Sequence, residues 1–274
     1  MKKALLVFVI VLVLSIGPAI ANAQQVPDPR VADVVRAGKV RAALFFPQYT
    51  TDPVTGEVRG SAGGIVMIAL ARALGARLGV EVVLIGHPTP LDAVECLKAG
   101  ACDVALGMGI DRTRVTEVEF SYPFMQLDFT YLVPPGSSIQ SVADADRPGV
   151  RIASVRNHAS TLALSRILKH AELVYAETPD TTFELLRAGH ADALAQARPV
   201  LLDYSSQLPG SRVLEERYGA YFLAMALPKG QAARLAYINE FVEEAKASGL
   251  VQRTIDRAGL RGIQVAPPGS PVAQ

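Results

Sequence analysis

One stretch of the chain, Cys102 to Phe124, contains residue types that can hold a small anion. An apolar run over residues 104–106 is typical of a buried strand, and Gly109 after it lets a ligand approach the backbone. Asp111 stands where an N-cap would open a short helical turn that includes Arg114. Backbone amides at a strand end, followed closely by an arginine, are a combination that binds carboxylates.

The same stretch resembles a motif of the bacterial extracellular solute-binding proteins of family three, the amino-acid-type periplasmic binding proteins. GMGIDRTRVTEVEFSYPF is similar to G-M-S-I-T-x-E-R-x-x-x-V-D-F-S-x-P-Y, with which that family grips the ligand carboxylate. The resemblance implies that Arg114 is the carboxylate anchor and that residues from Gly107 to Ile110 offer backbone groups to the ligand. The chain departs from the motif at Gly109, where the family usually has serine, and at Asp111, where it often has threonine.

The N-terminus predicts export. Lys2 and Lys3 precede an apolar segment from Ala4 to Ile16, and an A-x-A cleavage site follows at residues 21–23. We therefore expect a signal peptide over residues 1–23, cleavage after Ala23 and a periplasmic protein. The alternative is a membrane anchor, but the apolar segment is shorter than the roughly 20 residues that span a bilayer.

The charge balance argues against polyanionic partners. After cleavage the chain keeps 25 basic and 26 acidic residues, a formal charge of −1. Nothing in that balance favours nucleic acid or an anionic membrane surface. The four histidines show no spacing typical of metal ligands, so we expect neither a metal nor a cofactor.

One sequence pattern occurs twice in the chain. Residues 97–104, LKAGACDV, are echoed by residues 186–193, LRAGHADA, as a helix end, a glycine stop and a strand start. Each copy follows a helical pattern, over 91–98 and over 181–187. About 250 residues after the signal peptide can bury two cores, and the repeat favours two similar α/β lobes. The alternative is that L-x-A-G-x-x-D is merely a common connection between a helix and a strand.

The resemblance implies how the lobes are joined. Phe129–Val133 resembles the family's first crossing between lobes, and Tyr221–Leu227 fits the second. We therefore expect an α/β, two-lobed fold of the type II periplasmic-binding-protein kind with a discontinuous first lobe. The predicted limits are 31–133 and 222–262 for lobe 1, 134–221 for lobe 2 and 263–274 for a disordered tail rich in Pro and Gly.

Aromatic residues end the first predicted strand, residues 40–46. In the family an aromatic residue here stacks on the ligand, so Phe45, Phe46 and Tyr49 are candidates, with core packing as the alternative for each. The helix that follows departs from the family pattern G-F-D-x-D-L, because GIVMIAL at residues 64–70 has neither acid.

Lobe 2 offers a second set of candidates. Asn157, His158 and Ala159 occupy the family's G-[ST]-[ST] site, where amides at a helix start reach the ligand carboxylate from the opposite side. Asn157 can adopt the left-handed conformation that glycine would. His158 would replace a hydroxyl by an imidazole, unless it only caps or packs beside the helix.

A further departure concerns the ligand's amino group. Family members that bind α-amino acids often hold the ammonium with an aspartate in G-x-x-D-A-x-x-x-D-x-P, and Ala197 stands at that position. Either the ligand lacks an α-amino group or another acid such as Asp111 serves it. Gln196 can also reach the cleft, and Arg198 is a candidate for a second anionic group on the ligand, with a surface role as the alternative.

Cys96 and Cys102 are the only cysteines, and an exported protein meets an oxidising compartment. The sequence leaves two states open for this pair: a disulfide, or two buried thiols.

The resemblance implies a receptor that closes on a small carboxylate-bearing solute, an amino acid or a related organic acid, and delivers it to an ABC permease. We expect a monomer and no enzymatic activity. Two alternatives stay open: a periplasmic enzyme resembling cyclohexadienyl dehydratase, with Asp111 and His158 as its acid–base pair, and a receptor that feeds a sensor kinase.

Overall fold

The computed structural model describes residues 28–45, 48–61, 63–111 and 113–269. The predicted signal peptide and Phe46 lie outside these ranges. Within them, no helix combines the length and apolarity that crossing a bilayer requires.

The elements alternate between strands and helices, as expected for an α/β fold. The helices are α1 Ala32–Ala37, α2 Gly64–Leu78, α3 Pro90–Lys98, α4 Val142–Ala145, α5 Ala159–Leu164, α6 Pro179–Arg187, α7 Arg198–Gln207, α8 Ala232–Ala247 and α9 Leu250–Arg257, with 3-10 turns η1 Pro29–Val31 and η2 Arg114–Thr116. The strands are β1 Lys39–Phe45, β2 Tyr49–Thr51, β3 Val58–Gly60, β4 Glu81–His87, β5 Val104–Gly109, β6 Val118–Phe120, β7 Met125–Val133, β8 Arg151–Val155, β9 Glu172–Ala176, β10 Ala193–Ala197, β11 Arg212–Val213, β12 Gly219–Pro228 and β13 Ile263–Val265.

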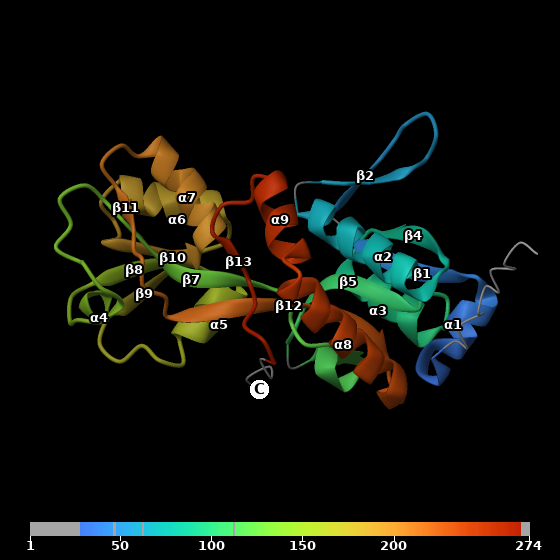
Figure 1. Cartoon of the computed structure of the whole chain (residues 1–274). Coiled ribbons are helices and arrows are strands. Elements are labelled where there is room, and N and C mark those ends of the chain that lie inside the picture. The colour runs from blue at the N-terminus through green and yellow to red at the C-terminus, as the bar shows by residue number, and fades with distance from the viewer. Residues whose placement is uncertain (1–27, 46–47, 62, 112, 270–274) are drawn as a thin grey trace, which may run out of the picture.

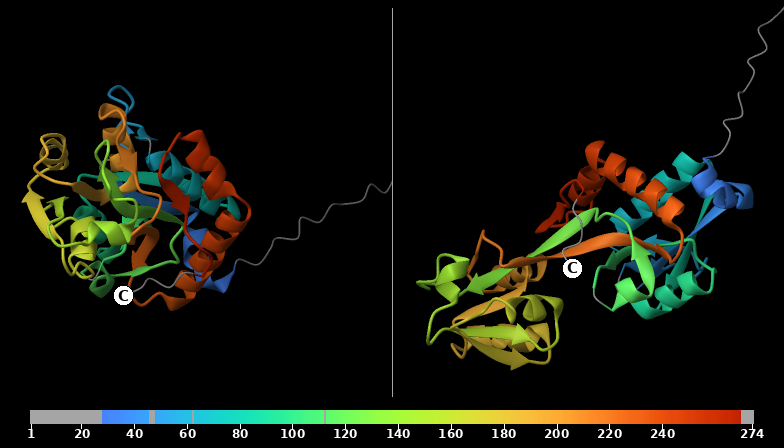
Figure 2. Two further views of the ribbon diagram at one scale, coloured as in Figure 1. Left: turned by 90° about the vertical axis from the view of Figure 1, so that its left-hand side faces the viewer. Right: turned by 90° about the horizontal axis from the view of Figure 1, so that it is seen from below.

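Two lobes share one sheet, whose strands follow the order β4-β1-β5-β12-β7-β10-β8-β9. Strands β1, β4 and β5 are parallel to one another in lobe 1, and β8, β9 and β10 are parallel in lobe 2. The long strands β7 and β12 pair antiparallel between them and run from one lobe into the other (Figures 1 and 2). These two strands are the crossings that the sequence predicts.

The apolar cores show that the first lobe is built from two separate parts of the chain. Its larger core combines residues between Val31 and Met125 with residues between Met225 and Ile255. The cores of the second lobe draw on residues between Tyr131 and Leu214. The chain therefore leaves lobe 1 along β7 and returns to it along β12.

The repeated sequence pattern corresponds to a repeated structure. Helices α3 and α6 each follow a threonine that caps the first turn, Thr89 and Thr178. Each helix is followed by a glycine with positive φ, 66° at Gly100 and 73° at Gly189. Such a left-handed residue ends a helix at little cost only when it is glycine.

The aspartate of each copy makes the same contacts. Asp103 accepts hydrogen bonds from the backbone and guanidinium of Arg41, with N···Oδ2 at 2.8 Å. Asp192 accepts the same bonds from Arg151, again with N···Oδ2 at 2.8 Å. The two lobes therefore use the same helix-to-strand unit, with the same aspartate–arginine contact, once each.

The C-terminal segment differs from the prediction. Its first part forms the helices α8 and α9, separated at Gly249. Disorder from residue 263 is wrong for residues 263–269, because β13 pairs with β7 and Ile263 and Val265 pack on the core of lobe 1. Composition alone hid this strand, since its two apolar residues lie next to a stretch rich in Pro and Gly.

Candidate functional site

The predicted anchor Arg114 lies just beyond the end of β5. Its Nη1 donates to the carbonyl of Gly109 and contacts Asp111, each at 2.9 Å. Asp111 also accepts from the amides of Thr113 and Arg114, both at 2.9 Å, and so caps the turn as predicted. Among the described residues, Nε and Nη2 of Arg114 have no hydrogen-bond partner, and this edge of the guanidinium suits a carboxylate.

One backbone group at the end of β5 already has a hydrogen-bond partner. The amide of Ile110 donates to the carbonyl of Phe222 in β12 at 3.2 Å. Of the backbone groups that residues 107–110 are expected to offer to a ligand, the amide of Ile110 is therefore already paired, because the contact of β5 with β12 extends to that residue.

Tyr221 of β12 lies over Gly109. A Cβ built on Gly109 would lie 1.5 Å from the Tyr221 hydroxyl oxygen. The Tyr221 ring also stacks near Phe129, with 6.4 Å between ring centroids. An aromatic side chain thus stands beside the carboxylate anchor, but it comes from the second crossing, where no sequence signal pointed to it.

The aromatic residues predicted to cover the ligand pack elsewhere. Phe45 is 8% exposed within a core cluster that includes Leu97 and Met108. Tyr49 is 7% exposed, and its ring lies against Gly86 of β4. Both pack in the core, as the alternative expects, while their contact with a ligand stays a prediction. Phe46 lies outside the described residues.

The start of α5 carries the lobe 2 candidates. Asn157 has φ of 60°, the one positive value at a non-glycine residue in the part of the chain that the structure describes, as predicted. His158 and Ala159 are exposed. The amide of His158 donates to the carbonyl of Val155 at 3.3 Å, so this amide is not open to a ligand, whereas the imidazole is.

Gln196 connects this turn to β10. Its Oε1 accepts from the hydroxyl of Ser160 at 3.1 Å and from the amide of Ala197 at 2.9 Å. Its Nε2 lies 3.3 Å from Nδ1 of His158. The buried amide therefore holds the exposed imidazole in place.

Arg198 is buried between α7 and the segment before β12. Its Nη1 and Nη2 donate to the carbonyls of Leu214 and Glu215 at 2.9 and 2.7 Å, and the residue is 9% exposed. The surface alternative for this arginine is therefore wrong, and its contact with a ligand stays a prediction.

A short part of β12 contacts both the lobe 1 candidates near Arg114 and the lobe 2 helix α5. Gly219 lies against Ala163 of α5, with 3.6 Å between the Ala163 Cβ and a Cβ built on Gly219. Tyr221, two residues further, covers Gly109. A strand rises about 3.4 Å per residue, so the two contacts are about 7 Å apart along the strand. The lobe 1 anchor and the lobe 2 helix therefore flank the same part of the hinge.

Cys96 and Cys102 form a disulfide in the structure, with Cα atoms 5.3 Å apart. His87 lies beside it, with Nε2 3.7 Å from the Cys102 sulfur. No sequence pattern indicated this placement of the histidine. The donor atoms of the three residues lie within 4.8 Å of one another, but the disulfide uses both sulfurs that a metal would need as thiolates.

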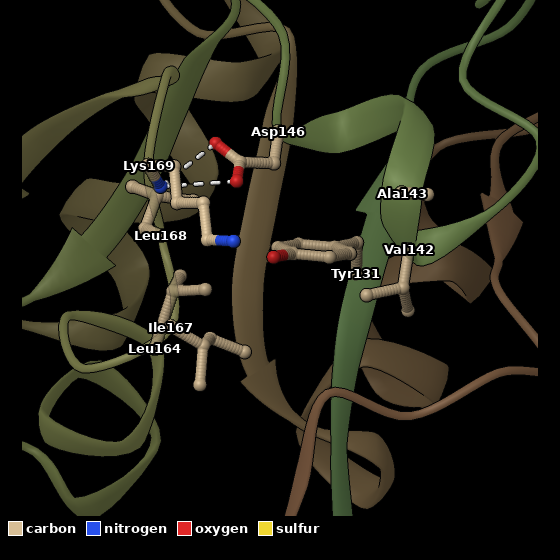
Figure 3. Close-up of a pocket in the computed structure, with 8 residues that line it drawn as sticks. All are labelled: Tyr131, Val142, Ala143, Asp146, Leu164, Ile167, Leu168 and Lys169. Carbon is tan, nitrogen blue, oxygen red and sulfur yellow. Dashed lines mark hydrogen bonds between the residues drawn. The ribbon is translucent and has the colours of Figure 1, made fainter.

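Lobe 2 also has a pocket outside this site. Its volume is about 260 Å³, and apolar residues of α4, of the end of α5 and of the segment after α5 line it together with Tyr131, Asp146 and Lys169 (Figure 3). Asp146 accepts backbone amides of residues 169–171, which holds the pocket wall. Burial raises the pKa of Tyr131. None of the residues predicted to bind the ligand lines this pocket.

Known proteins resemble the chain over most of its length. The model of the bacterial extracellular solute-binding proteins, family 3, matches residues 48–259. The glutamine-binding protein GlnH of an ABC transporter from Bacillus subtilis is 27% identical over 162 residues, which are 57% of each chain. The virulence sensor protein BvgS of Bordetella bronchiseptica is 28% identical over 136 residues, 49% of this chain and 11% of the sensor.

A solved structure resembles the fold more completely. It is that of an ancestral amino acid-binding protein, a precursor of cyclohexadienyl dehydratase, with 26% identity and a TM-score of 0.55 over 83% of this chain and 97% of that one. The chain matches just over half of the length of the glutamine-binding protein and about a tenth of the length of the sensor protein. Since the family model matches more than half of the chain, this chain belongs to the bacterial extracellular solute-binding proteins, family 3.

Proposed function

We propose that this chain is the periplasmic receptor of an ABC importer and binds a small carboxylate-bearing solute, an amino acid or a related organic acid, between its lobes. The observation that carries the proposal is Arg114: one edge of its guanidinium lacks a partner among the described residues, beside Tyr221 and Gly109 at the hinge. A planar guanidinium binds a carboxylate through two parallel hydrogen bonds. The relative from Bacillus subtilis, an ABC transporter glutamine-binding protein, supports the same interpretation.

Closure would take place at the crossing strands. The proposed lobes are residues 31–133 with 222–262, and residues 134–221. A ligand that touches both lobes favours the closed form by its extra contacts there, and periplasmic binding proteins are a standard example of such hinge closure. We propose that residues 1–23 are removed after Ala23 and that the protein acts as a monomer, which a permease then recognises.

The anchor is tested by isothermal titration of the exported chain, residues 24–274, with a panel of amino, oxo, hydroxy and dicarboxylic acids. Arg114→Ala should weaken binding of the acid found by about 2–5 kcal/mol, because the buried carboxylate loses its paired charge. Arg72→Ala, on the exposed face of α2, is the matched control and should bind normally. Normal affinity of Arg114→Ala would overturn the assignment.

A sensory role is the second candidate, and the similarity to a virulence sensor protein favours it. The same ligand-bound form would then contact a membrane receptor instead of a permease. Crosslinking in membranes of the source cell, followed by mass spectrometry of the captured partner, separates the two roles: transport predicts a permease subunit.

A dehydratase is the third candidate, because the ancestral neighbour is a precursor of such an enzyme. Asp111 is the acid nominated for it, and both of its oxygens already contact Arg114 or the turn amides. Incubation with cyclohexadienyl acids, followed by mass spectrometry for loss of water, tests this activity, and we expect none.

A further inference from the structure

We infer that the lobe 2 side of the cleft takes an oxygen atom of the ligand and not an ammonium group. This inference rests on the proposed function. The ligand would be an acid without an amino group, such as an oxo, hydroxy or dicarboxylic acid. His158 would determine this specificity.

The orientation of the Gln196 amide comes first. A backbone N–H can only donate, and the amide of Ala197 lies 2.9 Å from one side-chain atom of Gln196, so that atom is the oxygen. The Ser160 hydroxyl donates to the same oxygen. The atom directed at His158 is therefore the amide nitrogen.

The tautomer of His158 follows from that orientation. An amide nitrogen donates and does not accept, so Nδ1 of His158 accepts the hydrogen bond from Gln196. In the neutral imidazole this places the ring proton on Nε2. Gln196 is 6% exposed and its oxygen has two donors, which leaves little freedom to reverse the amide.

His158 is exposed, so its Nε2–H can meet a ligand. An N–H bonds an oxygen acceptor and opposes an ammonium, which has only donors. In lobe 1, Arg114 is a donor as well. A ligand that offers an oxygen acceptor to each of these donors, through one carboxylate or through two groups, satisfies both lobes.

Two acids, Asp111 and Asp128, are already paired with arginines. Asp111 contacts Arg114 at 2.9 Å and caps two amides. Asp128 of β7 contacts Arg217 at 2.9 Å and is 5% exposed. Ala197, at the position where the family often has an aspartate, supplies no charge. A desolvated ammonium beside Ala197 would therefore receive no carboxylate from that residue, and an unpaired buried charge is costly.

Calorimetry with matched ligands tests the inference. The exported chain is titrated with amino, oxo and hydroxy acids of the same carbon skeleton, and with dicarboxylic acids. We expect an amine-free acid to bind at least about tenfold more tightly than its amino counterpart, a difference of about 1.4 kcal/mol. Equal or tighter binding of the amino acids would overturn the inference and leave the proposed receptor function intact. Binding of none of these acids would overturn both.

Two variants sharpen the test. Ala197→Asp restores a carboxylate at the family position and should shift preference toward amino acids about tenfold. Gln207→Glu adds the same charge on the exposed face of α7 and should leave the preference unchanged. His158→Ala should weaken binding of the amine-free acid more than binding of the amino acid. Circular dichroism checks that each variant is folded. Parallel loss of both ligands in His158→Ala would contradict the specificity role.

Discussion

Gly109 lies so close to the ring of Tyr221 that any added side chain would require the ring to move. A Cβ on Gly109 would lie 1.5 Å from the hydroxyl oxygen and 2.0 Å from Cζ of Tyr221, closer than any non-bonded contact allows. The ring comes from β12 and stacks near Phe129 of β7, so both crossing strands hold it in place. The serine that the family usually has at this position would require the Tyr221 ring to move. The departure at Gly109 therefore goes together with an aromatic ring from β12 in that space.

The pair predicts a compensated substitution. Gly109→Ser should lower the free energy of unfolding by about 1–3 kcal/mol, because the added atoms overpack against the ring. Tyr221→Ala should remove most of that penalty, so urea unfolding of the single and double variants should give a clear coupling energy. Gly63→Ser, where no atom lies within 4 Å of the new Cβ, is the control. Additive effects of the two changes would contradict the contact.

Asn157 predicts a backbone effect at the lobe 2 turn. Its φ of 60° is strained for residues other than glycine and, to a smaller degree, asparagine. Asn157→Ala should cost about 1 kcal/mol of unfolding free energy, whereas Asn157→Gly should be nearly neutral. Chemical denaturation measures both. If alanine and glycine are tolerated equally, the turn does not require this conformation.

The fold was predictable from local signals. The repeated helix end, glycine stop and strand start identified two similar α/β units, because an amphipathic helix followed by a left-handed glycine is encoded within about ten residues. The left-handed turn at Asn157 and the cap at Asp111 were likewise local. The crossings were predicted by resemblance to the family.

Contacts between distant segments were not predictable. Tyr221 approaches Gly109 only because β12 pairs with β5, and Arg198 turns inward because carbonyls of Leu214 and Glu215 are placed beside it. Phe45 and Tyr49 are aromatic residues near a strand end, and their spacing does not say which face of the strand they occupy. The motif thus located the proposed anchor, while the sheet determined its surroundings.

The disulfide predicts a modest loss on reduction. Replacing Cys96 and Cys102 together by serine should lower stability by about 2 kcal/mol, since the bond closes a short loop in the unfolded chain. Thermal unfolding with and without a dithiol reductant checks this. The reductant should lower the Tm of the natural chain and leave that of the double variant unchanged. An equal response of both proteins would show that the bond does not contribute.

The ion pair of Arg151 with Asp192 predicts a loss of stability in acid. Hydrogen bonds from Arg151 lower the pKa of Asp192 below its ordinary value near 4. A carboxyl with a lower pKa in the folded state stabilises the fold above its unfolded pKa, and this contribution disappears as the pH falls through the folded pKa. Asp192→Asn should therefore cost stability at pH 7, and the difference from the natural chain should shrink as the pH falls below about 4.

Exposure to solvent limits how much the ion pair of Arg151 with Asp192 stabilises the fold. The side chains of Arg151 and Asp192 are 39% and 40% exposed, so we expect about 1 kcal/mol or less at pH 7. Urea unfolding at pH 7, 5 and 3 measures it, with Asp203→Asn on the exposed face of α7 as the control. A constant difference between Asp192→Asn and the natural chain at all three pH values would show that lost packing, and not the charge, explains the change. The matching contact between Arg41 and Asp103 in lobe 1 then offers a second site for the same measurement.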